Sequence, residues 1–276
     1  MNHLITIAGA GPGDPELLTM KAHKRLAEAE VVLYDALPGE AILKIAPKDA
    51  LFIYAGKLSC DGQSQFFRQQ AINRTLQEMA RQGKRVVRLK GGDPMIFGRG
   101  AEEIRFCKEQ KLNYEVIPGI TAAMAASSEF EIPLTERNHS SMVLLYTGSR
   151  VDGKFKKMNS VLEVLKSGST VSVYMGLKNL VEFVAALLDE GIPANTHVTI
   201  LSKVSQNDGD SLCGNLGNIA YLIEVAKPET PAIILIGKYA EKICVQQNVQ
   251  NKAIGSRTYT EAYSPPDEIT VYSNQS

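Results

Sequence analysis

Glycine-rich segments and one isolated carboxylate are the parts of this chain whose residue types and spacing could do chemistry. The first segment, GAGPGDP at residues 9–15, stands between a strand-like run and a helix-like run. Glycine adopts a positive φ without strain and lets a ligand approach the backbone closely. Asp35 ends the next strand-like run, where dinucleotide-binding proteins place the acid that binds ribose. Pro12, however, lacks the N–H donor that a pyrophosphate site would use. This segment alone leaves open a nicotinamide-dependent oxidoreductase and an ordinary turn.

The segment RLKGGDPMIFGRG at residues 88–100 is denser in unusual backbone. Gly91 and Gly92 are expected to expose backbone N–H and C=O groups at a strand end, and Asp93 can accept hydrogen bonds. Two further glycines flank Arg99 and indicate a second tight bend. So many special-backbone residues are costly unless a ligand or close packing requires them. We therefore predict that this segment lines a ligand site.

Two shorter segments have the same character. PGITAA at residues 118–123 brings small residues to a chain junction, where they allow close approach of a ligand or tight helix packing. YMGL at residues 174–177 again follows a strand-like run. Met175 within it could contact a ligand or simply fill a core.

Alternating β-branched runs and helical patterns must position these segments. Strands are expected at 4–8, 31–34, 51–54, 85–89 and 114–117, and then at 142–146, 170–174, 197–204 and 232–236. Helices are expected at 15–29, 39–45, 63–81, 100–109 and 120–129, and then at 160–166, 178–190 and 216–226. This rhythm is typical of largely parallel sheets with helices on both faces.

The fold class predicted is therefore α/β, with two consecutive α/β domains. We expect an N-terminal α/β domain at 1–118, a junction at 119–135, a C-terminal α/β domain at 136–245, and a polar tail at 246–276 that can bury little. In open α/β sheets, ligands bind beyond the carboxyl ends of strands, and every segment above lies at such an end. The active site is accordingly expected in the cleft between the domains.

Composition excludes partners held by bulk charge. Basic and acidic residues both number 30, so nucleic acid and membrane are not expected partners, and an anionic substrate must meet a local basic cluster. The N-terminus enters a strand-like run without the features of a signal peptide. Four scattered cysteines and four scattered histidines have no metal-ligand spacing, so no metal site is expected. These features favour a cytoplasmic protein with reduced thiols.

Taken together and in order, the segments resemble the tetrapyrrole methylase family, and within it the uroporphyrinogen-III C-methyltransferases. The resemblance runs from Leu4 to about Lys238, and GKRVVRLKGGDPMIFGRG at 83–100 is its most specific part. GAGPGDPELLT, VVLYDALP, PGITAA, IPLTER and YMGL support it. The resemblance implies methylation of an anionic tetrapyrrole by S-adenosylmethionine, with S-adenosylhomocysteine as product, in an enzyme that is usually a homodimer.

The resemblance also assigns residues. The cofactor contacts, mostly through backbone atoms, would be Pro12, Gly91, Gly92, Asp93, Ile96, Thr121, Ala122, Met175, Val204 and, more weakly, Ala232. An acid/base pair would fall on Asp35 and Lys57. Methylation of two pyrrole carbons of uroporphyrinogen III would give precorrin-2 for siroheme or cobalamin synthesis. Another precorrin methylase is the alternative.

Substrate carboxylates call for forked arginine contacts, and Arg99 and Arg137 are the candidates, with Lys90 after them. The chain departs from the family pattern at Leu58, where arginine is common, over the longer stretch 59–65, and at Glu136, where histidine is common. These departures lie on the substrate side of the expected site, not on the cofactor side.

Overall fold

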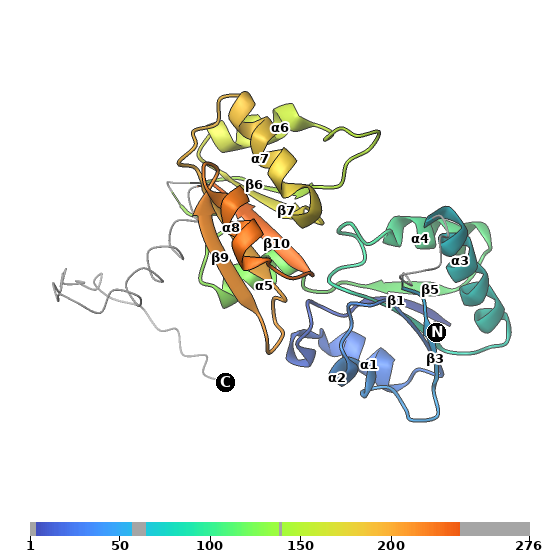
Figure 1. The fold of residues 1–276 in the computed structure, drawn as a ribbon. Helices are drawn as coiled ribbons and strands as arrows, with labels where there is room; N and C mark the ends of the chain where they lie inside the picture. The colour runs from blue at the N-terminus through green and yellow to red at the C-terminus, as the bar shows by residue number, and fades with distance from the viewer. Residues whose placement is uncertain (1–3, 57–64, 138–139, 238–276) are drawn as a thin grey trace, which may run out of the picture.

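The computed structural model describes residues 4–56, 65–137 and 140–237, and within them it contains two α/β domains, each built on a five-stranded sheet. Figure 1 shows the two domains as separate lobes, joined by the segment that leads from the first sheet into the second domain. The predicted fold of two consecutive α/β domains is confirmed.

The first sheet is entirely parallel. Its strands are β1 (Ile5–Gly9), β2 (Val31–Tyr34), β3 (Leu51–Tyr54), β4 (Val86–Lys90) and β5 (Tyr114–Ile117), in the order β3-β2-β4-β1-β5. The helices are α1 (Met20–Ala27), α2 (Glu40–Leu43), α3 (Gln65–Arg81) and α4 (Gly100–Glu109), with a 3₁₀ turn at Pro15–Leu17. Successive residues of a strand point to opposite faces, so Val87 and Leu89 pack against α1 and α2, whereas Val86 packs against α3 and α4. Because all five strands are parallel, their carboxyl ends lie along one edge of the sheet.

The second sheet is mixed. Its strands are β6 (Val143–Thr147), β7 (Thr170–Tyr174), β8 (His197–Ser202), β9 (Asp210–Asn215) and β10 (Ala232–Ile236), in the order β6-β7-β10-β8-β9. Its helices are α5 (Ala122–Glu129), α6 (Met158–Lys166), α7 (Leu180–Asp189) and α8 (Ile219–Ala226), with a 3₁₀ turn at Leu177–Asn179. β6, β7 and β8 run in one direction, and β10 runs against β7 and β8.

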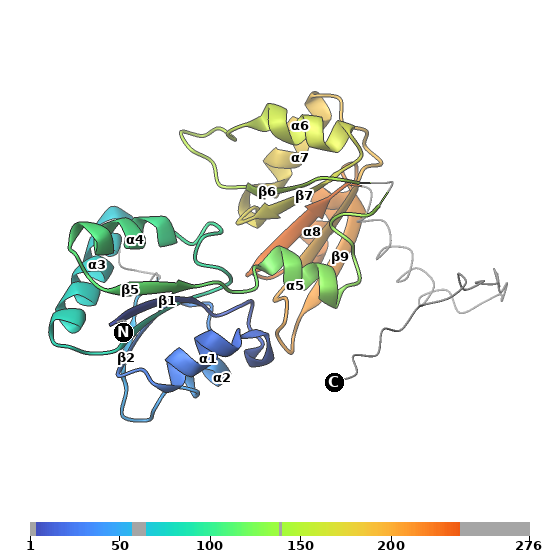
Figure 2. The same ribbon diagram turned by 180° about the vertical axis from the view of Figure 1, so that it is seen from behind.

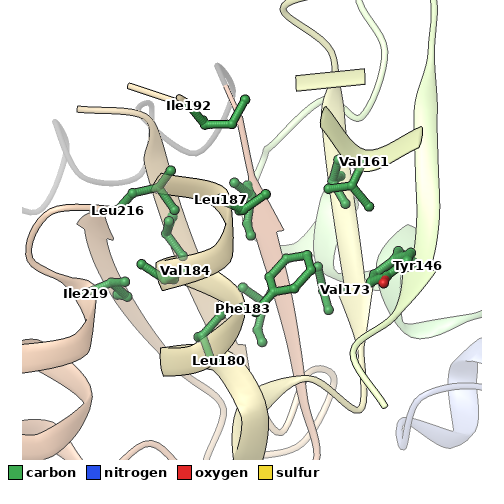
Figure 3. Packing of buried hydrophobic residues seen from close by; sticks show 14 of the residues in the cluster. Tyr146, Val161, Val173, Leu180, Phe183, Val184, Leu187, Ile192, Leu216 and Ile219 are labelled. Atoms are coloured by element: carbon green, nitrogen blue, oxygen red, sulfur yellow. The ribbon is translucent and has the colours of Figure 1, made fainter. Parts of the chain in front are cut away.

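The core of the second domain lies between its sheet and α6, α7 and α8. Phe183 of α7 is at its centre and stacks on Tyr146 with 5.6 Å between ring centroids (Figure 3). α5 covers the opposite face of the sheet, as seen from behind in Figure 2, and buries Ala123 and Ala126 there. The junction helix thus packs as part of the second domain.

Three details differ from the sequence-based expectations. The helix expected at 15–29 is interrupted, because Thr19 is extended and its side chain caps a new helix by accepting from the Ala22 N–H at 3.2 Å. The strand expected at 197–204 ends at Ser202, since Lys203 turns to a positive φ. β9 was not expected, because DSLCGN has weak β propensity and is held by pairing with β8. In the described part of the chain, no helix is long and apolar enough to span a membrane.

Candidate active site at the strand ends

Four glycines lock the loops of the central strands together. A Cβ on Gly9 would lie 2.5 Å from the Gly92 carbonyl oxygen, and one on Gly119 would collide with the same oxygen. Gly11 and Gly92 exchange two backbone hydrogen bonds, with N–O distances of 3.2 and 2.7 Å. The loops after β1, β4 and β5 therefore form one rigid unit that only glycine permits.

Asp93 fastens this unit. Its Oδ2 accepts from the Gly119 N–H at 3.0 Å, and its Oδ1 accepts from the Met95 N–H at 2.7 Å. Both carboxylate oxygens thus bind loop backbone, and Asp93 fixes where Gly91 and Gly92 lie.

Gly92 has a φ of +64°, as its predicted role requires. The expectation that its N–H is exposed was wrong, because that N–H donates to the Gly11 carbonyl. The Gly11 N–H is likewise bonded, to Gly92, so the glycine loop does not present these donors to a pyrophosphate. This arrangement disfavours the nicotinamide alternative. A Cβ on Gly92 would point toward Thr121, 3.8 Å from its Cα, so this space faces the start of α5.

The second domain brings three predicted residues to one edge. Met175 follows β7 with a φ of +52° and is 56% exposed, so it is not core filler. Val204 follows β8 and is buried, which leaves its backbone as the available contact. Ala232 begins β10 and pairs with Ser202, the last residue of β8. Because β10 runs against β7 and β8, its first residue lies at their carboxyl ends.

Tyr174 joins the end of β7 to the start of α5 and contacts the first domain through Phe97, and the sequence reasoning missed it. Its hydroxyl lies 2.8 Å from Thr121 Oγ1 and accepts from the Ala123 N–H at 3.1 Å. Its ring lies 5.1 Å from that of Phe97, in the loop after β4. Burial raises the pKa of the Tyr174 phenol, which therefore stays protonated. A tyrosine directly before Met175 at a strand end was the available signal.

A second contact joins the loop after β1 to the loop after β8. A Cβ on Gly13 would lie 2.9 Å from Gln206 Cγ and 3.2 Å from the Ser205 carbonyl oxygen. Glu129 of α5 accepts from the Ser205 N–H at 2.7 Å and so holds that loop. The strand ends of the two sheets therefore meet at two places.

Asp35 follows β2 and is 26% exposed at its side chain. Its Oδ1 accepts from the Leu37 N–H at 3.1 Å in a local turn, so it does not cap a helix. Its Oδ2 lies 3.9 Å from the guanidinium of Arg88, whose side chain is only 4% exposed. The Asp35 carboxylate is thus held at the end of β2, close to the buried Arg88 guanidinium.

Arg88 belongs to a buried ionic cluster between β4 and the helices α3 and α4. Glu103 is fully buried, and its Oε1 accepts from Arg88 Nε at 3.1 Å, Lys90 Nζ at 2.9 Å and Gln69 Nε2 at 3.3 Å. Burial and the Arg88 charge lower the pKa of Lys90, against the opposing effect of Glu103. The expectation that Lys90 could contact substrate was wrong, because even-numbered residues of β4 point into this cluster.

The remaining predicted residues are placed as follows. Arg99 adopts a left-handed φ of 60° before α4 and makes a two-pronged ion pair with Glu102, with N–O distances of 2.8 and 2.6 Å. Arg137 is exposed in the segment before β6, while Pro12 and Ile96 are half-buried in the loops after β1 and β4. Lys57, Leu58 and most of the stretch 59–65 lie outside the described residues. The described residues contain no group of three or more His, Cys, Asp or Glu side chains that could hold a metal ion.

This geometry defines a class of protein. Its members have two α/β domains, and the loops at the strand ends of both domains meet around backbone groups and small residues. The family model for tetrapyrrole (corrin/porphyrin) methylases matches residues 4–220, and the chain belongs to that family. The predicted family is confirmed.

Individual relatives agree with this membership. An S-adenosyl-L-methionine-dependent uroporphyrinogen III methyltransferase of Methanosarcina barkeri is 40% identical over 84% of this chain and 90% of its own length. A siroheme synthase of Psychrobacter arcticus is 42% identical over 84% of this chain, which spans only 42% of that longer protein. The solved uroporphyrin-III C-methyl transferase of Thermus thermophilus, complexed with S-adenyl homocysteine, is 34% identical, covers 86% of this chain and 99% of its own, and has a TM-score of 0.72.

Proposed function

We propose that this chain is a methyltransferase that uses S-adenosylmethionine to methylate two pyrrole carbons of uroporphyrinogen III, giving precorrin-2. The observation that carries the proposal is that the strand-end loops of the two domains meet, through the ring contact of Phe97 with Tyr174 and the close approach of Gly13 to Gln206. The Methanosarcina relative named for this activity matches nearly its whole length and supports the choice of substrate.

The residues at the strand ends fit S-adenosylmethionine. We assign its binding to Pro12, Gly91, Gly92, Asp93, Ile96, Thr121, Ala122, Met175, Val204 and Ala232. Glycine at 92 leaves open the space that a side chain would fill, and exposed Met175 offers an apolar contact. When bound, S-adenosylmethionine supplies an electrophilic methyl group on a sulfonium sulfur.

Positioning is the main task of the protein residues, because transfer to an electron-rich pyrrole carbon needs alignment more than strong acid catalysis. A proton must leave the substrate, and we assign Asp35 as the base that accepts it. Lys57 would donate a proton or pair with a substrate carboxylate. Arg99 and Arg137 would bind carboxylates; for Arg99 this means sharing its guanidinium with Glu102.

Departures from the family pattern at Leu58 and Glu136 keep another precorrin methylase as the second candidate, with the product directed to siroheme, cobalamin or a further tetrapyrrole. We also propose that the protein is a cytoplasmic homodimer. Size-exclusion chromatography with light scattering tests the oligomeric state.

Calorimetry and methyl transfer test the function together. We expect S-adenosylhomocysteine to bind one site per chain, NAD not to bind, and a labelled methyl group to pass from S-adenosylmethionine to uroporphyrinogen III. Binding of NAD alone would restore the oxidoreductase alternative. S-adenosylhomocysteine binding without transfer to any tetrapyrrole would indicate a binding module.

A further inference from the structure

The loop between β6 and α6 carries the local basic cluster that an anionic substrate requires. Residues 148–157, GSRVDGKFKK, contain four basic residues and one acidic residue, a net charge of 4 − 1 = +3 in a chain whose formal charge is zero. Lys154, Lys156 and Lys157 are all exposed. Among the residues that the structure describes, no carboxylate forms an ion pair with these three lysines, whereas Arg150 lies 3.7 Å from Glu182.

This loop is rigidly built. Val151 and Lys154 exchange backbone hydrogen bonds of 3.0 and 3.1 Å across Asp152 and Gly153, whose φ angles of 53° and 74° are those of a type I′ hairpin turn. Phe155 packs edge-on against the core residue Phe183, with 5.0 Å between the ring centroids. The lysines on either side of it therefore project from a fixed backbone, which lowers the entropy that binding would cost.

The start of the same loop is hydrogen-bonded to the segment around Met175. The Gly148 N–H donates to the Tyr174 carbonyl at 2.8 Å, and the Gly148 carbonyl accepts from Asn179 Nδ2 at 2.9 Å. A Cβ on Gly148 would collide with Gly176. β6 and β7 are parallel, so the loop leaves the sheet at the edge where Met175 lies. Figures 1 and 2 both show it extending toward the side on which the first domain lies.

From this placement we propose that Lys154, Lys156 and Lys157 form a subsite for the peripheral carboxylates of the tetrapyrrole. The inference rests on the proposed function and adds a substrate-binding surface to it. Exposed lysines suit this task, because carboxylates on flexible side chains need diffuse positive charge rather than one fixed geometry. Because the lysines would contact only the peripheral carboxylates of the substrate, the reacting pyrrole carbon stays accessible to Asp35.

The test compares two triple variants with the same change of charge. Lys154→Gln, Lys156→Gln and Lys157→Gln are combined in one protein. The control combines Lys24→Gln, Lys108→Gln and Lys111→Gln, three exposed lysines at or just beyond the far ends of α1 and α4. We expect the loop variant to raise the KM for uroporphyrinogen III on the order of tenfold, with kcat and S-adenosylhomocysteine affinity unchanged. The control should match the wild type, and added salt should raise the wild-type KM more than that of the loop variant.

Either of two results overturns the subsite: a KM within about twofold of the control, or loss of S-adenosylhomocysteine affinity, which would make the loop a support of the cofactor site. Failure of the proposed function is seen separately, as absence of methyl transfer by the wild type. Fluorescence titration with uroporphyrin III, which has the same carboxylates, then still tests the subsite, since equal affinity of both variants would exclude it.

Discussion

Removing the Tyr174 hydroxyl is expected to loosen the contact between the end of β7 and the start of α5 and to weaken S-adenosylhomocysteine binding. Tyr174→Phe keeps the ring and its packing on Phe97, so only the bonds to Thr121 and the Ala123 N–H are lost. At about 0.5–1.5 kcal/mol each, these bonds contribute roughly 2 kcal/mol to the free energy of unfolding. For a chain of this length, that corresponds to a fall of about 4–8 °C in Tm. Affinity should fall about tenfold, because Thr121 and Met175 would contact the cofactor from two sides.

Tyr146→Phe is the matched control. Its hydroxyl donates one bond of 2.7 Å to the Lys156 carbonyl, also within the second domain, and its ring is buried whereas that of Tyr174 is half-buried. Differential scanning fluorimetry and calorimetry on both variants separate the two effects. We expect both variants to lose stability and only Tyr174→Phe to lose affinity. Equal affinity of the two variants for S-adenosylhomocysteine would refute the claim that Tyr174 positions Thr121 and Met175 for cofactor binding.

Three further substitutions test other parts of the account. Gly92→Val should abolish most S-adenosylhomocysteine binding while the protein still folds, because a β-branched side chain at φ +64° is strained and fills the ligand space; normal calorimetric affinity would make the loop purely structural. Asp35→Asn should lower the single-turnover rate by roughly 10²–10⁴ with little change in cofactor affinity, whereas lost affinity with an unchanged rate would make Asp35 a ribose ligand. Glu103→Leu should lower the free energy of unfolding by about 3–5 kcal/mol in urea titrations, since Arg88 and Lys90 lose their buried counter-ion; a change below about 1 kcal/mol would contradict that cluster's importance.

Hydrophobic periodicity predicted most of the fold because each domain buries its strands and one stripe of each helix. The helix expected at 100–109 coincides with α4, and nine of the ten strands in the described ranges were expected. β9 escaped because its stability comes from a partner strand far along the sequence. The break before α1 escaped because Thr19 competes with the helix through a side-chain cap.

The local geometry of the candidate site was predictable where it depends on backbone and small residues, and less so where it depends on long-range contacts. Gly92 has the positive φ angle that its glycine-rich segment indicated, whereas the positive φ angle of Met175 was not predicted. The direction of Lys90 into a buried cluster follows from strand alternation and the unforeseen partner Glu103. The bond from Tyr174 to Thr121 spans 53 residues of sequence, and no local pattern reports it.

The central claim is tested most directly by the mass of the product formed from uroporphyrinogen III and S-adenosylmethionine. We predict a tetrapyrrole in which two hydrogens have been replaced by methyl groups, with two molecules of S-adenosylhomocysteine released for each. Unchanged uroporphyrinogen III, under conditions in which S-adenosylmethionine binds, would contradict the assigned substrate.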